Sequence, residues 1–170
     1  MKAIKVDLYK KHHGEYVTPK EPVFITIGPA KYLTLAGQGS PKGEEFAAAI
    51  SALYSVAFTL KMAEKAAGHD YKVCHLEGQW WTDAGSDWQT TKPEQWHWRL
   101  LMRVPEFVDE KEVWVAIKTV LAKGKGGALS MRSSWRLSMR GAAFRSCMWV
   151  HIPPRRRHWR KWPSSRKLRA

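Results

Sequence analysis

Glu77 is the residue whose surroundings in the sequence point most directly to chemistry. It stands three residues before the tryptophan pair Trp80 and Trp81. A carboxylate beside an aromatic wall can hold a cationic or polar group of a ligand, or act as a general acid or base with a raised pKa. An exposed strand glutamate paired with Lys72 or Arg99 would give the same pattern, so both interpretations stay open.

Four tryptophans fall on two segments that we expect to be adjacent strands: Trp80, Trp81, Trp96 and Trp98. They could line an aromatic cleft for a flat or amphipathic small molecule, or they could form one large core face. Because side chains alternate along a strand, Trp80 and Trp81 cannot both point into the core. We therefore expect one tryptophan of each pair to line a pocket.

Two further aromatic residues, Tyr54 and Phe58, lie four positions apart on a predicted helix, beside its main apolar stripe. They could line the same cleft from the helix side, although packing between helix and sheet is the favoured interpretation. No metal site is expected, because the spacing of the histidines resembles no ligand pattern. No cofactor is expected either, since the glycines between Gly37 and Gly43 do not form a phosphate-binding loop.

The elements that must position these residues follow from the apolar pattern. Strands are predicted at Val23–Ile27, Lys31–Ala36, Tyr71–Gly78 and Gln95–Val104, with helices at Glu44–Ala67 and from Asp109 to Gly124. Apolar residues recur in the first helix at three- and four-residue steps, which builds one apolar face. The last two strands are expected to pair as a hairpin.

This order predicts an α+β fold in which a helix packs on an antiparallel sheet. On the strand Gln95–Val104, alternation puts Trp96, Trp98, Leu100 and Met102 on one face, and His97, Arg99, Leu101 and Arg103 on the other. The segment from Lys2 to Tyr16 is polar and basic and is predicted to be an irregular arm.

Charge divides the chain into two parts, 1–125 and 126–170. All 15 acidic residues lie in the first part, whereas the second holds 12 of the 29 Lys and Arg. A folded domain normally mixes both signs on its surface, so we predict a boundary near residue 125 and an irregular, disordered basic tail after it. Such a tail could bind nucleic acid through Arg155–Arg157 and its tryptophans.

The remaining composition indicates a cytoplasmic protein. Two cysteines, Cys74 and Cys147, suggest no disulfide framework. The N-terminus has no apolar segment typical of a signal peptide. No apolar run approaches the roughly 18 residues that a membrane-crossing helix needs, so no membrane partner is expected.

Residues 1–125 resemble the GyrI-like small-molecule-binding family. The segments that carry the resemblance are 5–9 with Glu15–Pro19, Gly28–Leu33 with Gly37–Gly39, Leu53–Phe58, Tyr71–Val73 with Leu76–Gly78, Trp80–Trp81, and Trp96–Trp98 leading to Leu101–Pro105. The order and spacing of the set are more specific than any one segment.

The resemblance implies a strand–helix–strand–strand unit used twice, with a ligand cleft between the halves. Only the first copy is recognisable here, and a homodimer is one way to replace the second. The family implies binding of amphipathic, cationic or drug-like molecules in toxin or multidrug resistance and sensing. It implies, as an alternative, hydrolysis of cyclopropane-containing DNA-alkylating natural products, with Glu77 as a catalytic residue. In the family that chemistry also uses a glutamate from the second half, and no residue in 126–170 matches that glutamate. The resemblance therefore leaves open whether this chain is an enzyme.

A shift of reading frame offers an explanation for the tail. Back-translation of 126–170, shifted by one base, yields strings typical of an acidic turn, a strand, a Gly-Pro turn and an amphipathic helix, which the family places here. We therefore hypothesise that 126–170 is out of frame. Nucleic-acid binding through the tail is the second alternative function.

Overall fold

The computed structural model describes residues 5–16, 28–83, 86–87 and 89–124, and the backbone of two strands in the basic tail. The elements, in chain order, are the helix α1 (Leu8–Lys11), the 3-10 turn η1 (His13–Glu15), β1 (Ala30–Gln38), α2 (Glu44–Ala66), β2 (Leu76–Trp81), the 3-10 turn η2 (Pro93–Gln95), β3 (His97–Val104), α3 (Glu110–Ala122), β4 (Ser134–Arg140) and β5 (Val150–His151).

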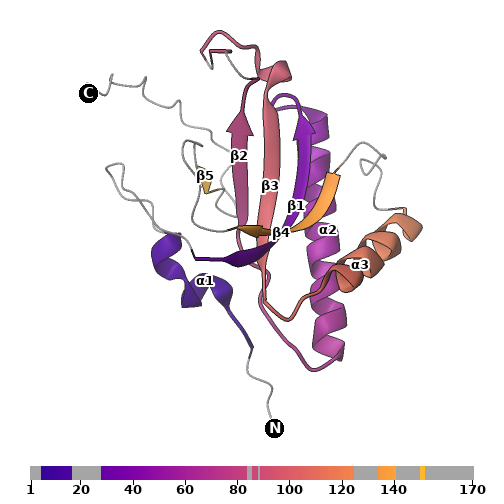
Figure 1. The fold of residues 1–170 in the computed structure, drawn as a ribbon. Coiled ribbons are helices and arrows are strands. Elements are labelled where there is room, and N and C mark those ends of the chain that lie inside the picture. Colours follow the sequence, from indigo (N-terminus) through magenta and orange to yellow (C-terminus); the bar gives the residue numbers. More distant parts are fainter. Residues whose placement is uncertain are drawn as a thin grey trace.

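An antiparallel sheet with the strand order β4-β1-β3-β2-β5 forms the centre of the fold. Figure 1 shows α2 running along one face of the central strands, with α3 beside it. The predicted hairpin of β2 and β3 is confirmed, with Glu77 opposite Leu101 and Trp80 opposite Trp98. The α+β class, a helix packed on an antiparallel sheet, is confirmed with it.

The helix α2 matches its predicted bounds to within one residue. Glu44 and Glu45 lie in its first turn, where carboxylates stabilise the positive end of the helix dipole. Gly68, just past the end, has φ of 93°, a backbone conformation that favours glycine. The side chains buried against the sheet are Phe46, Ala49, Ala52, Leu53, Val56, Ala57 and Leu60.

With 23 residues, α2 is by length and composition able to cross a membrane, although the sequence was expected to contain no apolar run of that kind. The residues between its apolar positions are small rather than charged, which raises its mean hydropathy. Its buried face packs on the sheet, and this is the position of a core helix in the fold.

The helix α3 begins with a complete capping box. The Asp109 carboxylate accepts a hydrogen bond from the Glu112 backbone N–H, and the Glu112 carboxylate accepts one from the Asp109 N–H, both at 2.8 Å. Val113, Ile117 and Val120 then pack against the same core as α2. The predicted second helix is confirmed.

The prediction of an irregular N-terminal arm is wrong for residues 8–15. Asp7 caps α1 by accepting a hydrogen bond from the Lys10 backbone N–H at 3.1 Å. Leu8 and Tyr16 are buried in the main core, and Val6 and Tyr9 pack against it, so a few apolar anchors order a segment that is otherwise polar. The turn η1 follows directly and brings Glu15 and Tyr16 to the sheet.

The predicted strand Tyr71–Gly78 is shorter in the structure. The segment Tyr71–Gly78 becomes a strand only at Leu76, because Tyr71 instead makes an isolated parallel bridge with Val6 of the N-terminal arm. The predicted strand Val23–Ile27 lies outside the described residues.

The prediction of an irregular tail is wrong for Ser134–Arg140, which form β4. This strand pairs with β1 from Ala30 opposite Arg140 to Ala36 opposite Ser134. The other side of β1 pairs with β3, so β4 satisfies a row of backbone groups that would otherwise form a free edge. Backbone pairing of this kind needs no apolar pattern, so no local signal in the sequence marks this strand.

Candidate functional site

The sheet has two faces of different chemistry. The face toward α2 carries Trp80, Trp98 and Leu100 and belongs to the main hydrophobic core. The opposite face, called here the second face, carries Glu77, Gln79 and Trp81 from β2; His97, Arg99, Leu101 and Arg103 from β3; and Tyr32, Thr34 and Ala36 from β1. The first face is apolar, whereas the second gathers most of the groups that could bind or react.

Glycines make room for the two core indoles. A Cβ added to Gly37 would lie 2.4 Å from carbons of the Trp98 ring, and one added to Gly78 would lie 2.3 Å from the Trp80 ring. Phe46 of α2 contacts both indoles, with ring centroids 5.9 Å from Trp80 and 5.3 Å from Trp98. Trp80 and Trp98 are therefore core residues, as the alternative of one large core face has it for these two, and the sheet separates them from Glu77.

Glu77 lies in the middle of the second face and is only 1% exposed. Its cross-strand neighbour is Leu101, whose other neighbour is Thr34 of β1. On the other side, the β2 backbone at Glu77 pairs with β5 at His151. The alternative of an exposed strand glutamate paired with Lys72 or Arg99 is therefore excluded.

Tyr16 connects the groups around Glu77. Its hydroxyl accepts a hydrogen bond from the Cys74 thiol, with Sγ and Oη 3.4 Å apart, and it is also hydrogen-bonded to Arg103. Burial raises the pKa of Tyr16 far above its usual value, and the charge of Glu77 adds to this shift. The phenol consequently keeps its proton, which makes it a candidate hydrogen-bond donor and a poor acid.

The charge of the buried Arg103 is balanced from the N-terminal arm. Its Nη1 lies 2.7 Å from Glu15 Oε2, and the Arg103 side chain is 6% exposed. Burial raises the pKa of the Cys74 thiol, so Cys74 stays protonated and is not a thiolate nucleophile at neutral pH. Tyr16 and Cys74 lie close enough to Glu77 for its charge to raise their pKa values, and Arg103 is linked to them through Tyr16.

Trp81 marks the other end of the second face. It is half-buried, and its ring stacks on His97 with centroids 5.7 Å apart at an angle of 15°. The Arg99 guanidinium carbon lies 5.6 Å from the Trp81 ring centroid. His97 Nε2 in turn lies 2.9 Å from Asp83 Oδ1. Of the four predicted pocket tryptophans, Trp81 is the one that shares a face with Glu77.

The other predicted aromatic residues lie elsewhere. Trp96 packs at the margin of the main core, and its indole N–H donates to the Thr91 carbonyl at 3.0 Å. Tyr54 and Phe58 stack on each other on α2, with centroids 6.3 Å apart. They are on the helix side of the sheet and do not share a face with Glu77, contrary to the idea of a common cleft.

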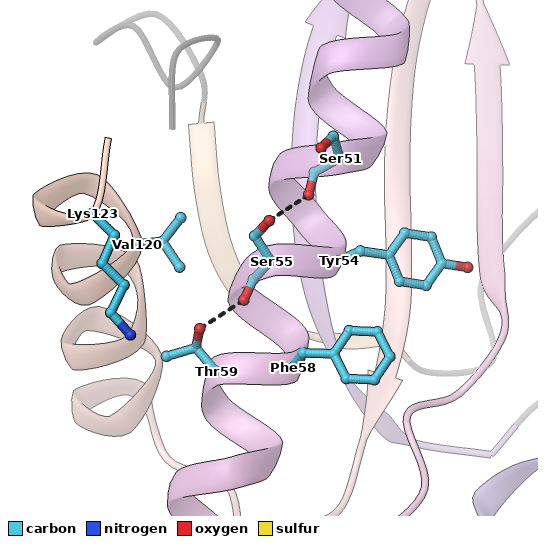
Figure 2. Close-up of a pocket in the computed structure, with 7 residues that line it drawn as sticks. All are labelled: Ser51, Tyr54, Ser55, Phe58, Thr59, Val120 and Lys123. Atoms are coloured by element: carbon cyan, nitrogen blue, oxygen red, sulfur yellow. Dashed lines mark hydrogen bonds between the residues drawn. The ribbon is translucent and has the colours of Figure 1, made fainter. Parts of the chain in front are cut away.

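Tyr54 and Phe58 instead border a surface hollow of about 410 Å³ between α2 and α3. Figure 2 shows their rings pointing away from α3, while Val120 and Lys123 of α3 form the opposite side. The floor consists of hydroxyl residues that bond to the helix backbone: Ser55 donates to the Ser51 carbonyl and Thr59 to the Ser55 carbonyl. The hollow offers little that would orient a ligand, so the second face is the stronger candidate.

Three site residues were not predicted from the sequence: Tyr16, Tyr32 and Arg103. Signals for them existed. Arg103 shares with Leu101 the strand face opposite Trp98. Tyr16 lies within one of the segments that carry the family resemblance. The proximity of Tyr16 to Glu77 depends on the fold of η1 and has no sequence signature. Most of the tail, including Arg155–Arg157, lies outside the described residues.

Comparison with known proteins gives structural relatives. No family model and no curated protein matches the chain. A hydrolase encoded by lin2189 from Listeria innocua superposes with a TM-score of 0.67 at 26% identity, covering 81% of this chain and 67% of that one. A further Listeria innocua hydrolase has a TM-score of 0.64 at 30% identity, covering 81% and 66% of the two chains.

A third solved structure, an uncharacterized conserved protein from Listeria innocua, is 30% identical with a TM-score of 0.67. The match covers 81% of this chain and 68% of that protein, so the chain spans about two thirds of its relatives' length. At this identity and coverage the relationship extends beyond a shared fold. The chain therefore belongs to the same family as this Listeria innocua protein.

Proposed function

We propose that the second face of the sheet is a small-molecule-binding site of the GyrI-like type, used to capture or sense toxic or drug-like compounds. One observation carries the proposal: a carboxylate, Glu77, is 1% exposed at the centre of a sheet face that also carries aromatic and hydrogen-bonding groups. A buried carboxylate needs compensating partners, so folds without a use for it tend to replace it with an apolar residue. The half-buried ring of Trp81 supplies the apolar contact that such a site needs.

Binding can be tested through tryptophan fluorescence. Titration with a panel of aromatic compounds should quench or shift the emission, and Trp81→Phe should remove most of the signal change. Trp114→Phe is the matched control, because Trp114 is exposed on α3, on the far side of the sheet. A panel that leaves the wild-type spectrum unchanged argues against the site.

The second candidate function is hydrolysis, which is favoured by the two Listeria innocua relatives described as hydrolases. In this candidate Glu77 would accept a proton from an attacking water molecule. Tyr16 would donate a hydrogen bond to the group that receives the electron pair of the breaking bond, and that group would take its proton from solvent. For an activated cyclopropane, water adds to one ring carbon, the carbon–carbon bond breaks, and its electrons pass to the conjugated acceptor.

Turnover separates binding from hydrolysis. Incubation with an activated cyclopropane compound, followed by mass spectrometry, should reveal a product heavier by one water if the chain is a hydrolase. Glu77→Gln should then lower the rate by about 100-fold or more, the scale typical of losing a general acid or base, while ligand still binds. Glu45→Gln, an exposed change on α2, should leave the rate unaltered. If the compound binds and no product forms, the result supports ligand capture without hydrolysis.

A further inference from the structure

The second face changes from buried to exposed along its strands. On β1, Thr34 is 4% exposed, Ala36 is half-buried and Gln38 is exposed. On β3, Arg103 is 5% exposed whereas Arg99 is exposed. The face therefore has a closed end around Arg103 and an open end around Arg99, with Glu77 on the closed side.

Arg99 differs from the other charged groups of this face. Arg103 is paired with Glu15, and His97 is paired with Asp83. No carboxylate lies within ion-pair distance of Arg99 among the described residues. The contact with the Trp81 ring orients its guanidinium without using its hydrogen-bond donors in a salt bridge.

The two cross-strand neighbours of Arg99 differ in exposure: the one on β1 is half-buried, whereas the one on β2 is only 2% exposed. The residue opposite it on β1 is Ala36, whose side chain is a single methyl group, and the residue opposite it on β2 is Gln79. Gln79 lies two positions from Glu77, so the rows of Arg99 and Glu77 are about 7 Å apart. A planar guanidinium presents paired donors that match a carboxylate, sulfonate or phosphate.

We propose that Arg99 gives this site a preference for flat ligands that carry one negative charge. The anionic group pairs with Arg99, and the uncharged ring extends along Trp81 toward the open end, away from the buried part of the face around Glu77. This inference rests on the proposed small-molecule site and adds a ligand class to it. It reverses the expectation of cationic ligands that the family resemblance implies.

The test uses three ligands of one shape and different charge: 2-naphthoate, 2-naphthalenemethanol and 2-naphthylmethylammonium. Isothermal titration calorimetry on the full chain should show naphthoate binding about 10-fold more tightly than the alcohol, the ratio expected for one charge-assisted pair in a partly exposed site. The ammonium compound should bind most weakly of the three.

Variants assign the preference to Arg99. Arg99→Gln should bring the affinity for naphthoate down to that for the alcohol, and leave the alcohol unchanged. Arg99→Lys should keep part of the preference, since it keeps the charge and loses the planar fork. Lys118→Gln removes an exposed cation from α3, on the other side of the sheet, and should change nothing.

The outcomes separate this inference from the proposed site. If the alcohol and naphthoate bind equally, or if Arg99→Gln keeps the tenfold preference, the role of Arg99 is refuted while the small-molecule site stands. The same holds if the ammonium compound binds best. If none of the three compounds binds, both the site and its charge preference are refuted. Circular dichroism of Arg99→Gln establishes that the variant is folded.

Discussion

At the scale of single residues, the glycines beneath the core indoles have a role that only the packed structure reveals. We expect Gly37→Ala to destabilise the protein by about 1–3 kcal/mol, because the added Cβ would overlap the Trp98 ring in a close-packed core. Thermal unfolding measures this. Gly14→Ala is the control, since nothing lies within 4 Å of a Cβ there, and an equal loss in both variants would contradict the packing argument.

A second residue-scale prediction concerns Glu64 of α2, which is 3% exposed. Burial raises its pKa, and so do a hydrogen bond with Glu112 and the charge of Glu112. Because the pKa in the folded state lies above the unfolded value of 4.5, the folded state binds the proton more tightly than the unfolded state does. The stability that this proton gives is complete below pH 4.5 and is lost as the pH rises through the folded-state pKa.

We therefore expect Glu64→Gln to increase the free energy of unfolding at pH 7, by a gain on the order of 1 kcal/mol, and to change it little near pH 4. Urea unfolding at the two pH values measures the difference. Glu106→Gln, in the exposed turn before α3, is the control and should show no such pH dependence. A loss of stability at pH 7 in Glu64→Gln would show that the carboxylate stabilises the fold instead, through His69 at 3.3 Å.

At the scale of elements, the start of α3 rests on two reciprocal hydrogen bonds. Asp109→Ala removes one of them, and we expect it to cost about 1 kcal/mol, the typical loss for an N-cap aspartate. Glu110→Ala is the matched control, because this neighbouring carboxylate is exposed and makes no capping bond. Chemical unfolding measures the free energy of unfolding of both variants. An equal loss in the two would show that the negative charge, and not the capping hydrogen bond, stabilises the helix start.

Some elements could be predicted well from the sequence because their signals are local. The helix Glu44–Ala66 shows a strong apolar period, and the hairpin of β2 and β3 has a regular alternation, so both could be predicted. The strand β4 could not, since its evidence is the unpaired edge of β1, a hundred residues away in the chain. The site divides in the same way: Glu77 and Trp81 are marked by local pattern, whereas Tyr16 comes near Glu77 only through the tertiary fold.

At the scale of the whole molecule, removing the tail should expose the outer edge of β1. A chain that ends at residue 125 lacks β4, and an unpaired strand edge promotes association between copies. We expect the shortened chain to form dimers or larger species at concentrations where the full chain does not. Light scattering after size-exclusion chromatography measures this, and a monomeric shortened chain would contradict it.

The frameshift hypothesis also belongs to this scale. The Listeria innocua relatives extend well beyond the matched region, which gives room for the second unit that the family resemblance implies. We expect the coding DNA from the Ala116 codon onward to continue, in an adjacent frame, as a second strand–helix–strand–strand unit. Sequencing of that DNA is the measurement, and a single unbroken frame would refute the hypothesis.

Because the tryptophans are divided between the two faces of the sheet, their intrinsic fluorescence should report on the two faces separately. The indoles of Trp80 and Trp98 are 6% and 2% exposed, so they should emit at short wavelength and resist iodide or acrylamide. The half-buried Trp81 sits where a ligand would arrive, and should emit further to the red. With the exposed Trp114 replaced by Phe, excitation at the red edge of the absorption band would favour Trp81 over Trp80 and Trp98, so loss of the core and occupation of the site could be followed separately in one unlabelled sample.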